Sequence, residues 1–205
     1  TDIDLEGEKS GLIPTSEWKE RMRGEPWIPG ETISASIGQG FNLVTPIQLA
    51  NMIAAIANGG TILKPRVVSK IETTDGNLVR EMKPNIQRKL AVTQENLDII
   101  KDALHGVVHD LRGTGRASHI PGIEVAGKTG TAQVIKMKEI EDRRDEDIPF
   151  EFRDHGWFVA FAPFENPIIA VSVLAEHGGH GGSAAAPIAG KLMKSYMERS
   201  KGKTS

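Results

Sequence analysis

The sequence predicts an α+β fold in which helices cover an antiparallel sheet. Three apolar stretches of strand length lie at 123–135, 157–163 and 168–175. Short apolar runs bounded by turn-forming residues are typical of buried strands, and the last two runs are spaced to pair as a hairpin. Longer segments with helical periodicity lie before and after them. That order of elements is typical of helices packed on an antiparallel sheet.

Three segments carry helix signals. Thr45 is placed as an N-cap, Pro46 suits the first helical position, and Gln48 completes a capping box. The residues that follow are apolar on nearly all sides, so this helix is expected to be buried. Thr93 caps a second helix, and a third begins near Ala184. The apolar stripe expected on the third helix consists of Ile188, Leu192, Met193 and Tyr196.

Residues 61–92 are expected to form a small β excursion. Asp75-Gly76 is a strong hairpin-turn signal between 70–72 and 78–80. This region therefore adds strands outside the main sheet.

The remaining segments lack long periodic elements. Residues 1–44 are rich in glycine, proline and polar residues, so we expect short strands and loops there. The mixed charges of 136–154 are typical of a solvated loop. Residues 200–205 are expected to form a disordered tail.

Composition limits the classes of protein that need to be considered. The 205 residues are 39% hydrophobic, enough for one substantial core, and the net charge of −2 favours no nucleic-acid partner. There is no cysteine, so disulfides are excluded, and no apolar run is long enough to span a membrane. No signal peptide is visible, and the opening residues are typical of a loop inside a domain. We therefore expect the chain to be part of a longer protein.

The stretch V-A-G-K-T-G-T-A-Q-V places a cation between two glycines in the middle of an expected strand. Glycine weakens a strand unless a ligand or another backbone must come close. Gly127 and Gly130 bracket Lys128, so a ligand could lie against this backbone. The alternative is a twisted strand with a solvent-exposed lysine.

Strand alternation sorts the side chains of this stretch. Thr129 and Thr131 would share one face and Lys128 would lie on the other. Two hydroxyls on one face can hold a carboxylate, and a backbone N–H beyond the glycine can stabilise an oxyanion. A peptide could also add to the strand through main-chain hydrogen bonds. The pattern indicates a strand whose centre faces a substrate.

Histidines offer two further candidates. His105 and His109 are four residues apart on the second helix and could share a metal ion, but a solvated helix end is the preferred interpretation. The run 177–182, H-G-G-H-G-G, could bind a metal or an anion. It is interpreted instead as the flexible connection from the last strand to the last helix.

K-T-G is one of the motifs shared by β-lactamases and penicillin-binding proteins. Six longer blocks occur around it, in this order: G-L-I-P-T-S-E-W-K, W-I-P-G-E-T-I-S-A-S-I-G-Q-G, T-P-I-Q-L-A-N-M-I-A-A-I-A-N-G-G, V-A-G-K-T-G-T-A-Q-V, H-G-W-F-V-A-F-A-P and E-H-G-G-H-G-G-S-A-A-A-P-I-A. Together they closely resemble the transpeptidase domain of class B penicillin-binding proteins, and within it the penicillin-binding protein 2 group. The resemblance implies a penicillin-binding-protein/β-lactamase-like fold, with 1–199 as the C-terminal portion of that domain.

The resemblance also implies an activity. The family's D,D-transpeptidases cross-link peptidoglycan stem peptides ending in D-Ala-D-Ala through an acyl-serine, and β-lactams acylate the same serine. It implies Lys128 and Thr131 as catalytic residues, with Thr129, Gly130 and Thr131 binding substrate. No cofactor and no nucleic acid are implied. A glycosyltransferase partner and a membrane anchor that holds the domain on the extracytoplasmic side are implied.

The nucleophile is the part of the resemblance that this chain lacks. The family's S-x-x-K and S-x-N motifs should lie N-terminal to these residues, and no S-x-N occurs. Ser16 and Lys19 do form an S-x-x-K string, but its surroundings make a poor frame for a buried helix, so we interpret it as a chance match. Without its upstream segment the chain is expected to be inactive. A D,D-carboxypeptidase or β-lactamase relative, or a non-catalytic β-lactam-binding or interaction module, remain alternatives.

Overall fold

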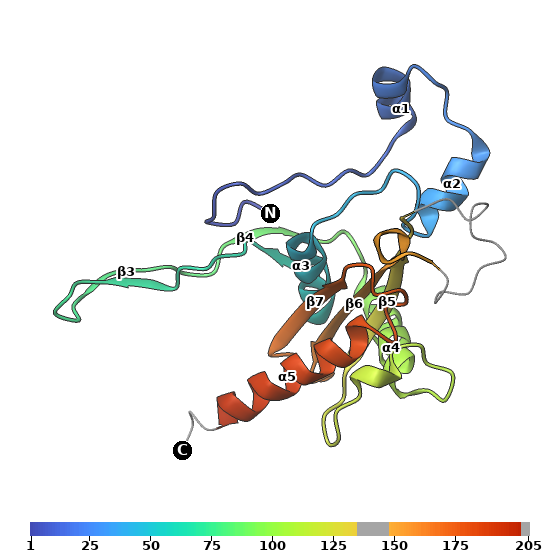
Figure 1. The fold of residues 1–205 in the computed structure, drawn as a ribbon. Helices are drawn as coiled ribbons and strands as arrows, with labels where there is room; N and C mark the ends of the chain where they lie inside the picture. Colours follow the sequence, from blue (N-terminus) through green and yellow to red (C-terminus); the bar gives the residue numbers. More distant parts are fainter. Residues whose placement is uncertain (135–147, 202–205) are drawn as a thin grey trace.

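A three-stranded antiparallel sheet lies at the centre of the computed structural model, which describes residues 1–134 and 148–201. Its strands are β5 (Ala126–Ala132), β6 (His155–Ala162) and β7 (Ile169–Ala175), with β6 in the middle (Figure 1). All three predicted strands are present, with ends shifted by a few residues. The predicted α+β class is confirmed.

Helices cover the two faces of this sheet. α5 (Ala185–Lys201) contacts β6 and β7, α3 (Pro46–Ala57) also packs on these two strands, and α4 (Gln94–His109) contacts β5. Because side chains alternate along a strand, β6 contributes to two separate clusters of buried hydrophobic residues. Phe158 belongs to the cluster with α5, and Val159 belongs to the cluster with α3.

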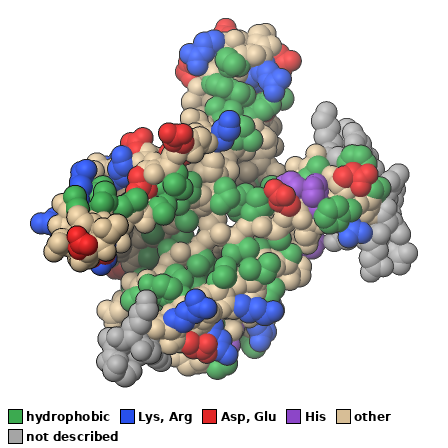
Figure 2. All heavy atoms as spheres, turned by 60° about the vertical axis from the view of Figure 1, so that its left-hand side comes forward, with side chains coloured by type: hydrophobic (Ala, Val, Ile, Leu, Met, Phe, Trp, Pro, Cys, Tyr) green, Lys and Arg blue, Asp and Glu red, His purple; other side chains and the backbone are tan. Residues whose placement is uncertain are grey.

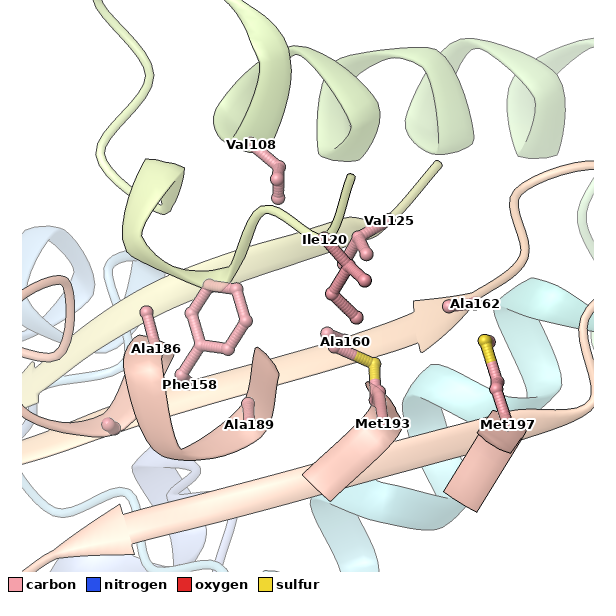
Figure 3. Close-up of a cluster of buried hydrophobic side chains, with 11 residues drawn as sticks. Val108, Ile120, Val125, Phe158, Ala160, Ala162, Ala186, Ala189, Met193 and Met197 are labelled. Atoms are coloured by element: carbon pink, nitrogen blue, oxygen red, sulfur yellow. The ribbon is translucent and has the colours of Figure 1, made fainter. Parts of the chain in front are cut away.

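Figure 3 shows the α5-side cluster, in which Phe158 and Ala160 of β6 lie opposite Met193 of α5 and Val108 of α4. These four side chains are buried from solvent. The short 3₁₀ helix η1 (Arg116–Ser118) also contacts α5. The core therefore joins elements from both sides of β5 in the sequence.

Local signals in the sequence are confirmed at two helix starts. Thr45 and Gln48 form the predicted capping box of α3, with Gln48 N–H donating to Thr45 Oγ1 and Thr45 N–H donating to Gln48 Oε1. Thr93 caps α4 by accepting from the Asn96 N–H. The helix starts were therefore readable from the sequence.

The predicted β excursion is also present. β2 (Lys70–Glu72) pairs with β3 (Leu78–Glu81) around the predicted turn, and β1 (Thr61–Leu63) pairs with β4 (Ile86–Lys89). The β2–β3 hairpin extends away from the central sheet in Figure 1, and all its strand residues are exposed.

The expectation of strands and loops over 1–44 is wrong in part. Residues Ser16–Arg23 form α1 and residues Pro29–Ser36 form α2. Each helix has eight residues, too few to show a clear helical period. Lys19 links the two helices: its Nζ lies 2.6 Å from Glu31 Oε1, and this hydrogen bond raises the pKa of the Lys19 ammonium.

The predicted stripe of α5 is mostly wrong. Met193 is fully buried, but Leu192 is 52% exposed, and Ile188 and Tyr196 are similarly exposed. Small residues face the sheet instead, namely Ala185, Ala186 and Ala189, which lets the helix backbone lie close to its neighbours.

Several other apolar side chains also remain at the surface. The expectation that α3 is buried all round is met only in part, because Met52 is 46% exposed. Figure 2 shows hydrophobic side chains at the surface over several parts of the molecule. None of the helices among the described residues is both long and apolar enough to cross a bilayer.

Two segments that we expected to be a loop and a tail contain helical residues. Within 136–154, residues 136–147 lie outside the described residues, and Phe150–Phe152 form the 3₁₀ helix η4. α5 includes Ser200 and Lys201, which we expected to belong to a tail. Residues 202–205 also lie outside the described residues.

Neighbouring residues of α5 provide a test of this packing. Met193→Ala removes a fully buried side chain, so it should lower the free energy of unfolding by about 2–5 kcal/mol. Leu192→Ala should change it by less than about 1 kcal/mol, because half of that side chain is in water. Urea unfolding of the two variants measures the difference. Equal losses would show that α5 is docked through a different face.

Candidate active site

The motif strand β5 pairs with β6 without any register shift, from Ala126 opposite Phe161 to Ala132 opposite His155. Thr129 lies opposite Phe158, and Lys128 lies opposite Val159. Because cross-strand partners share a face, Thr129 and Thr131 lie on the α5 side of the sheet and Lys128 lies on the α3 side. The predicted separation of the two hydroxyls from the lysine is confirmed.

The two glycines of the motif differ in how closely the surrounding atoms pack against them. A Cβ at Gly127 would lie 2.6 Å from the Phe158 ring and 2.7 Å from Val159 O, so this position is small because the core packs against it. The ligand approach expected at Gly127 is therefore not needed to explain it. Of the described residues, a Cβ at Gly130 would meet only Trp157 Cβ within 4 Å, at 3.3 Å.

Among the described residues no strand pairs with the edge of β5 opposite β6, called its free edge, and two carbonyl groups on this edge accept side-chain hydrogen bonds. Lys128 Nζ donates to Thr129 O across 2.8 Å, and Gln39 Nε2 donates to Thr131 O across 2.6 Å. In an antiparallel pair, the N–H and C=O of one residue point to the same edge, and alternate residues share that edge. Since β6 lies along the other edge, Thr129 and Thr131 direct both backbone groups outward.

Thr114 joins the site although sequence reasoning missed it. It lies in the loop between α4 and η1, and its hydroxyl oxygen is 2.9 Å from that of Thr129. No local pattern marks Thr114, because only the packing of α4 against β5 brings this loop to the strand. Two adjacent hydroxyls on the α5 side can donate hydrogen bonds to a carboxylate.

The glycine-rich loop after β7 passes directly over the β5–β6 pair. A Cβ at Gly181 would lie 2.0 Å from Trp157 O and 2.5 Å from Gly130 O, so only glycine fits. A Cβ at Gly182 would lie 2.4 Å from Thr114 O. As expected, 177–182 connects the last strand to the last helix, and it borders the candidate site.

The histidines at the end of α4 are not a solvated helix end, so that expectation is wrong. The rings of His105 and His109 stack with centroids 4.2 Å apart, and His119 lies edge-on to His109. The Val125 N–H donates to His109 Nε2 across 3.2 Å, directly before β5 begins. Burial, followed by the neighbouring His105 and His119, lowers the pKa of His109.

This histidine cluster is a structural junction between α4 and β5. Across the described residues, no group of three or more histidine, cysteine, aspartate or glutamate side chains is placed to hold a metal ion. Glu124 is the acidic neighbour, with Oε2 3.3 Å from His105 Nε2.

The S-x-x-K string at Ser16 does not form a serine–lysine pair. Ser16 is the exposed first residue of α1, which Thr15 caps. The Lys19 ammonium instead contacts Glu31 and donates to Pro26 O across 2.9 Å. The lysine therefore has a structural role between α1 and α2.

Comparison with known proteins identifies the family. A family model for the penicillin binding protein transpeptidase domain matches residues 1–194, so the chain belongs to this family. The peptidoglycan D,D-transpeptidase MrdA of Haemophilus influenzae is 36% identical over 202 residues, which cover 97% of this chain and 31% of that protein. The resemblance carried by the six sequence blocks is confirmed.

Solved structures agree with this assignment. Pseudomonas aeruginosa PBP2, determined in complex with WCK 5153, is 38% identical with a TM-score of 0.74, covering 94% of this chain and 39% of that one. Helicobacter pylori PBP2, determined in complex with MreC, is 27% identical with a TM-score of 0.72, covering 94% of this chain and 32% of that one. The chain thus spans about a third of the length of these relatives.

The low pKa of His109 predicts a pH dependence of stability. The unfolded chain, with an ordinary histidine pKa of 6.5, binds a proton more readily than the folded chain. The free energy of unfolding should therefore fall as the pH drops below 6.5 toward the lower pKa of the folded state. His109→Gln, which keeps an acceptor but cannot be protonated, should reduce this loss.

Urea unfolding at about pH 7.5 and about pH 5.5 measures the effect. His180→Gln, which replaces an exposed histidine in the loop after β7, is the matched control. A control variant that reduces the pH dependence as much as His109→Gln would contradict the assignment to His109.

Proposed function

We propose that this chain forms one wall of the active site of a peptidoglycan D,D-transpeptidase. The observation that carries the proposal is the arrangement of β5, whose one free edge presents the backbone of Thr129 and Thr131. A peptide can add to such an edge as an extra strand. Membership of the transpeptidase-domain family supports the same conclusion.

The residues of the motif take separate roles in this reaction. The hydroxyls of Thr129 and Thr131, supported by Thr114, bind the terminal carboxylate of the stem peptide. The Thr131 N–H supplies half of an oxyanion hole for the scissile carbonyl. Lys128 provides the positive charge beside the reacting serine, from the other face of the strand.

The serine nucleophile is proposed to come from outside these 205 residues. Its hydroxyl oxygen attacks the carbonyl carbon of the D-Ala-D-Ala bond, the C–N bond breaks, and D-alanine leaves with the proton as a free amine. An amine of a neighbouring stem peptide then attacks the ester, which forms the cross-link and regenerates the serine. A β-lactam acylates the serine by opening its own ring amide.

The cellular setting is part of the same proposal. The full protein is proposed to act during cell-wall elongation on the extracytoplasmic side of the membrane, held by an anchor outside this chain. A glycosyltransferase that makes the glycan strands is its proposed partner. No cofactor takes part in the proposed steps.

Acylation by a fluorescent penicillin tests the proposal. In the protein with its upstream segment, Lys128→Ala should slow labelling about 100-fold or more, because a charge placed at the reacting centre is lost. Lys194→Ala removes the same charge from the exposed face of α5 and should leave labelling unchanged. Stopped-flow fluorescence measures the rates, and mass spectrometry locates the acylated residue.

Two results would contradict the proposal. One is undiminished labelling of the Lys128→Ala variant. The other is labelling of the 205-residue chain alone at Ser16, which would place the nucleophile in α1.

A further inference from the structure

A side chain of the loop after α2 is hydrogen-bonded to β5. Gln39 Nε2 donates to Thr131 O across 2.6 Å, although the two residues are 92 positions apart. Because a carbonyl oxygen can only accept, the amide nitrogen of Gln39 must be the atom that faces Thr131. The glutamine thus occupies the outward acceptor of the residue proposed to form the oxyanion hole.

The backbone around Gln39 is fixed from both sides. Gly38 and Gly40 flank it with φ angles of 77° and 73°, a left-handed conformation that glycine adopts without strain. The Gln39 N–H donates to Ser34 O, and Gln39 O accepts from Asn42 Nδ2, both across 2.9 Å. The turn therefore aims a partly buried side chain at the strand.

The hydrogen bond that Gln39 makes is the one that an added strand would make. A peptide lying antiparallel along the free edge of β5 donates its N–H groups to outward carbonyls such as Thr131 O. A β-lactam with an acylamino group carries a comparable N–H beside its ring. Gln39 and such a ligand therefore compete for one acceptor.

We propose that Gln39 occupies the Thr131 carbonyl on the free edge of β5 and is displaced when an acyl-donor peptide or an acylamino β-lactam binds. The inference rests on the proposed transpeptidase function and adds a specificity element to it. A ligand with an N–H at this position replaces the lost hydrogen bond, whereas a ligand without one leaves Thr131 O unpaired.

The hydrogen bond from Gln39 also explains how this edge of β5 can remain without a paired strand. An unpaired strand edge is a template for pairing with any other chain. An amide side chain satisfies the Thr131 acceptor without adding a strand. Another outward carbonyl, Thr129 O, accepts a hydrogen bond from the exposed side chain of Lys128 in the same way.

The test compares two ligands on the protein with its upstream segment. Benzylpenicillin carries an acylamino N–H next to the lactam carbonyl, whereas sulbactam carries only hydrogen at that carbon. Acylation rates and melting temperatures are measured for Gln39→Ala and for Gln39→Met, whose side chain has a similar length but no N–H donor and no charge. Gln87→Ala is the matched control, because it removes a similar amide-to-carbonyl bond, to Thr1 O, away from the site.

Competition between Gln39 and the ligand predicts that the Gln39 variants change the acylation rate of benzylpenicillin but not that of sulbactam. Both Gln39 variants should be acylated by benzylpenicillin about threefold to tenfold faster, the factor expected from losing one competing hydrogen bond. Their sulbactam rates should change by less than about twofold, as should both rates of the control. Unchanged benzylpenicillin rates, or parallel slowing with both ligands, would contradict the proposed competition at Thr131 O. If the unmutated protein reacts with neither ligand, the transpeptidase proposal itself fails, and the proposed role of Gln39 fails with it.

Discussion

The pairing of β5 with β6 along a single edge is the constraint on which the rest of the site depends. Its unbroken register puts Thr129 opposite Phe158, so the hydroxyls lie on the side where α5 packs. A slip of one residue would exchange the faces of Lys128 and the threonines. The same pairing directs the backbone N–H and C=O groups of Thr129 and Thr131 to the other edge, where they can hydrogen-bond to a ligand.

Close backbone contacts keep that strand in place. Gly127 admits the ring of Phe158, which ties β5 to the core, and Gly181 lets the loop after β7 rest on Gly130. His109 accepts a hydrogen bond from the residue just before the strand. Strand β5 is therefore held just before its first residue, at Gly127 and at Gly130 by segments distant in the sequence.

The sequence predicted the parts of this arrangement that depend on local chemistry. Capping by Thr45 and Gln48, the strand positions and the two faces of the motif follow from side-chain periodicity and backbone hydrogen bonding. Thr114, Gln39 and His109 were missed as neighbours of β5, because tertiary packing alone brings them there. The exposed stripe of α5 was misjudged for a related reason: alanines, which carry a weak hydrophobic signal, form its buried face together with Met193 and Met197.

The most direct test is a crystal structure of the longer protein acylated by benzylpenicillin. The proposed arrangement predicts the drug along the free edge of β5, with its carboxylate within about 3.2 Å of the Thr129 and Thr131 hydroxyl oxygens. The ester carbonyl oxygen should accept from the Thr131 N–H. A drug bound away from this edge, or with its carboxylate distant from both threonines, would contradict the account.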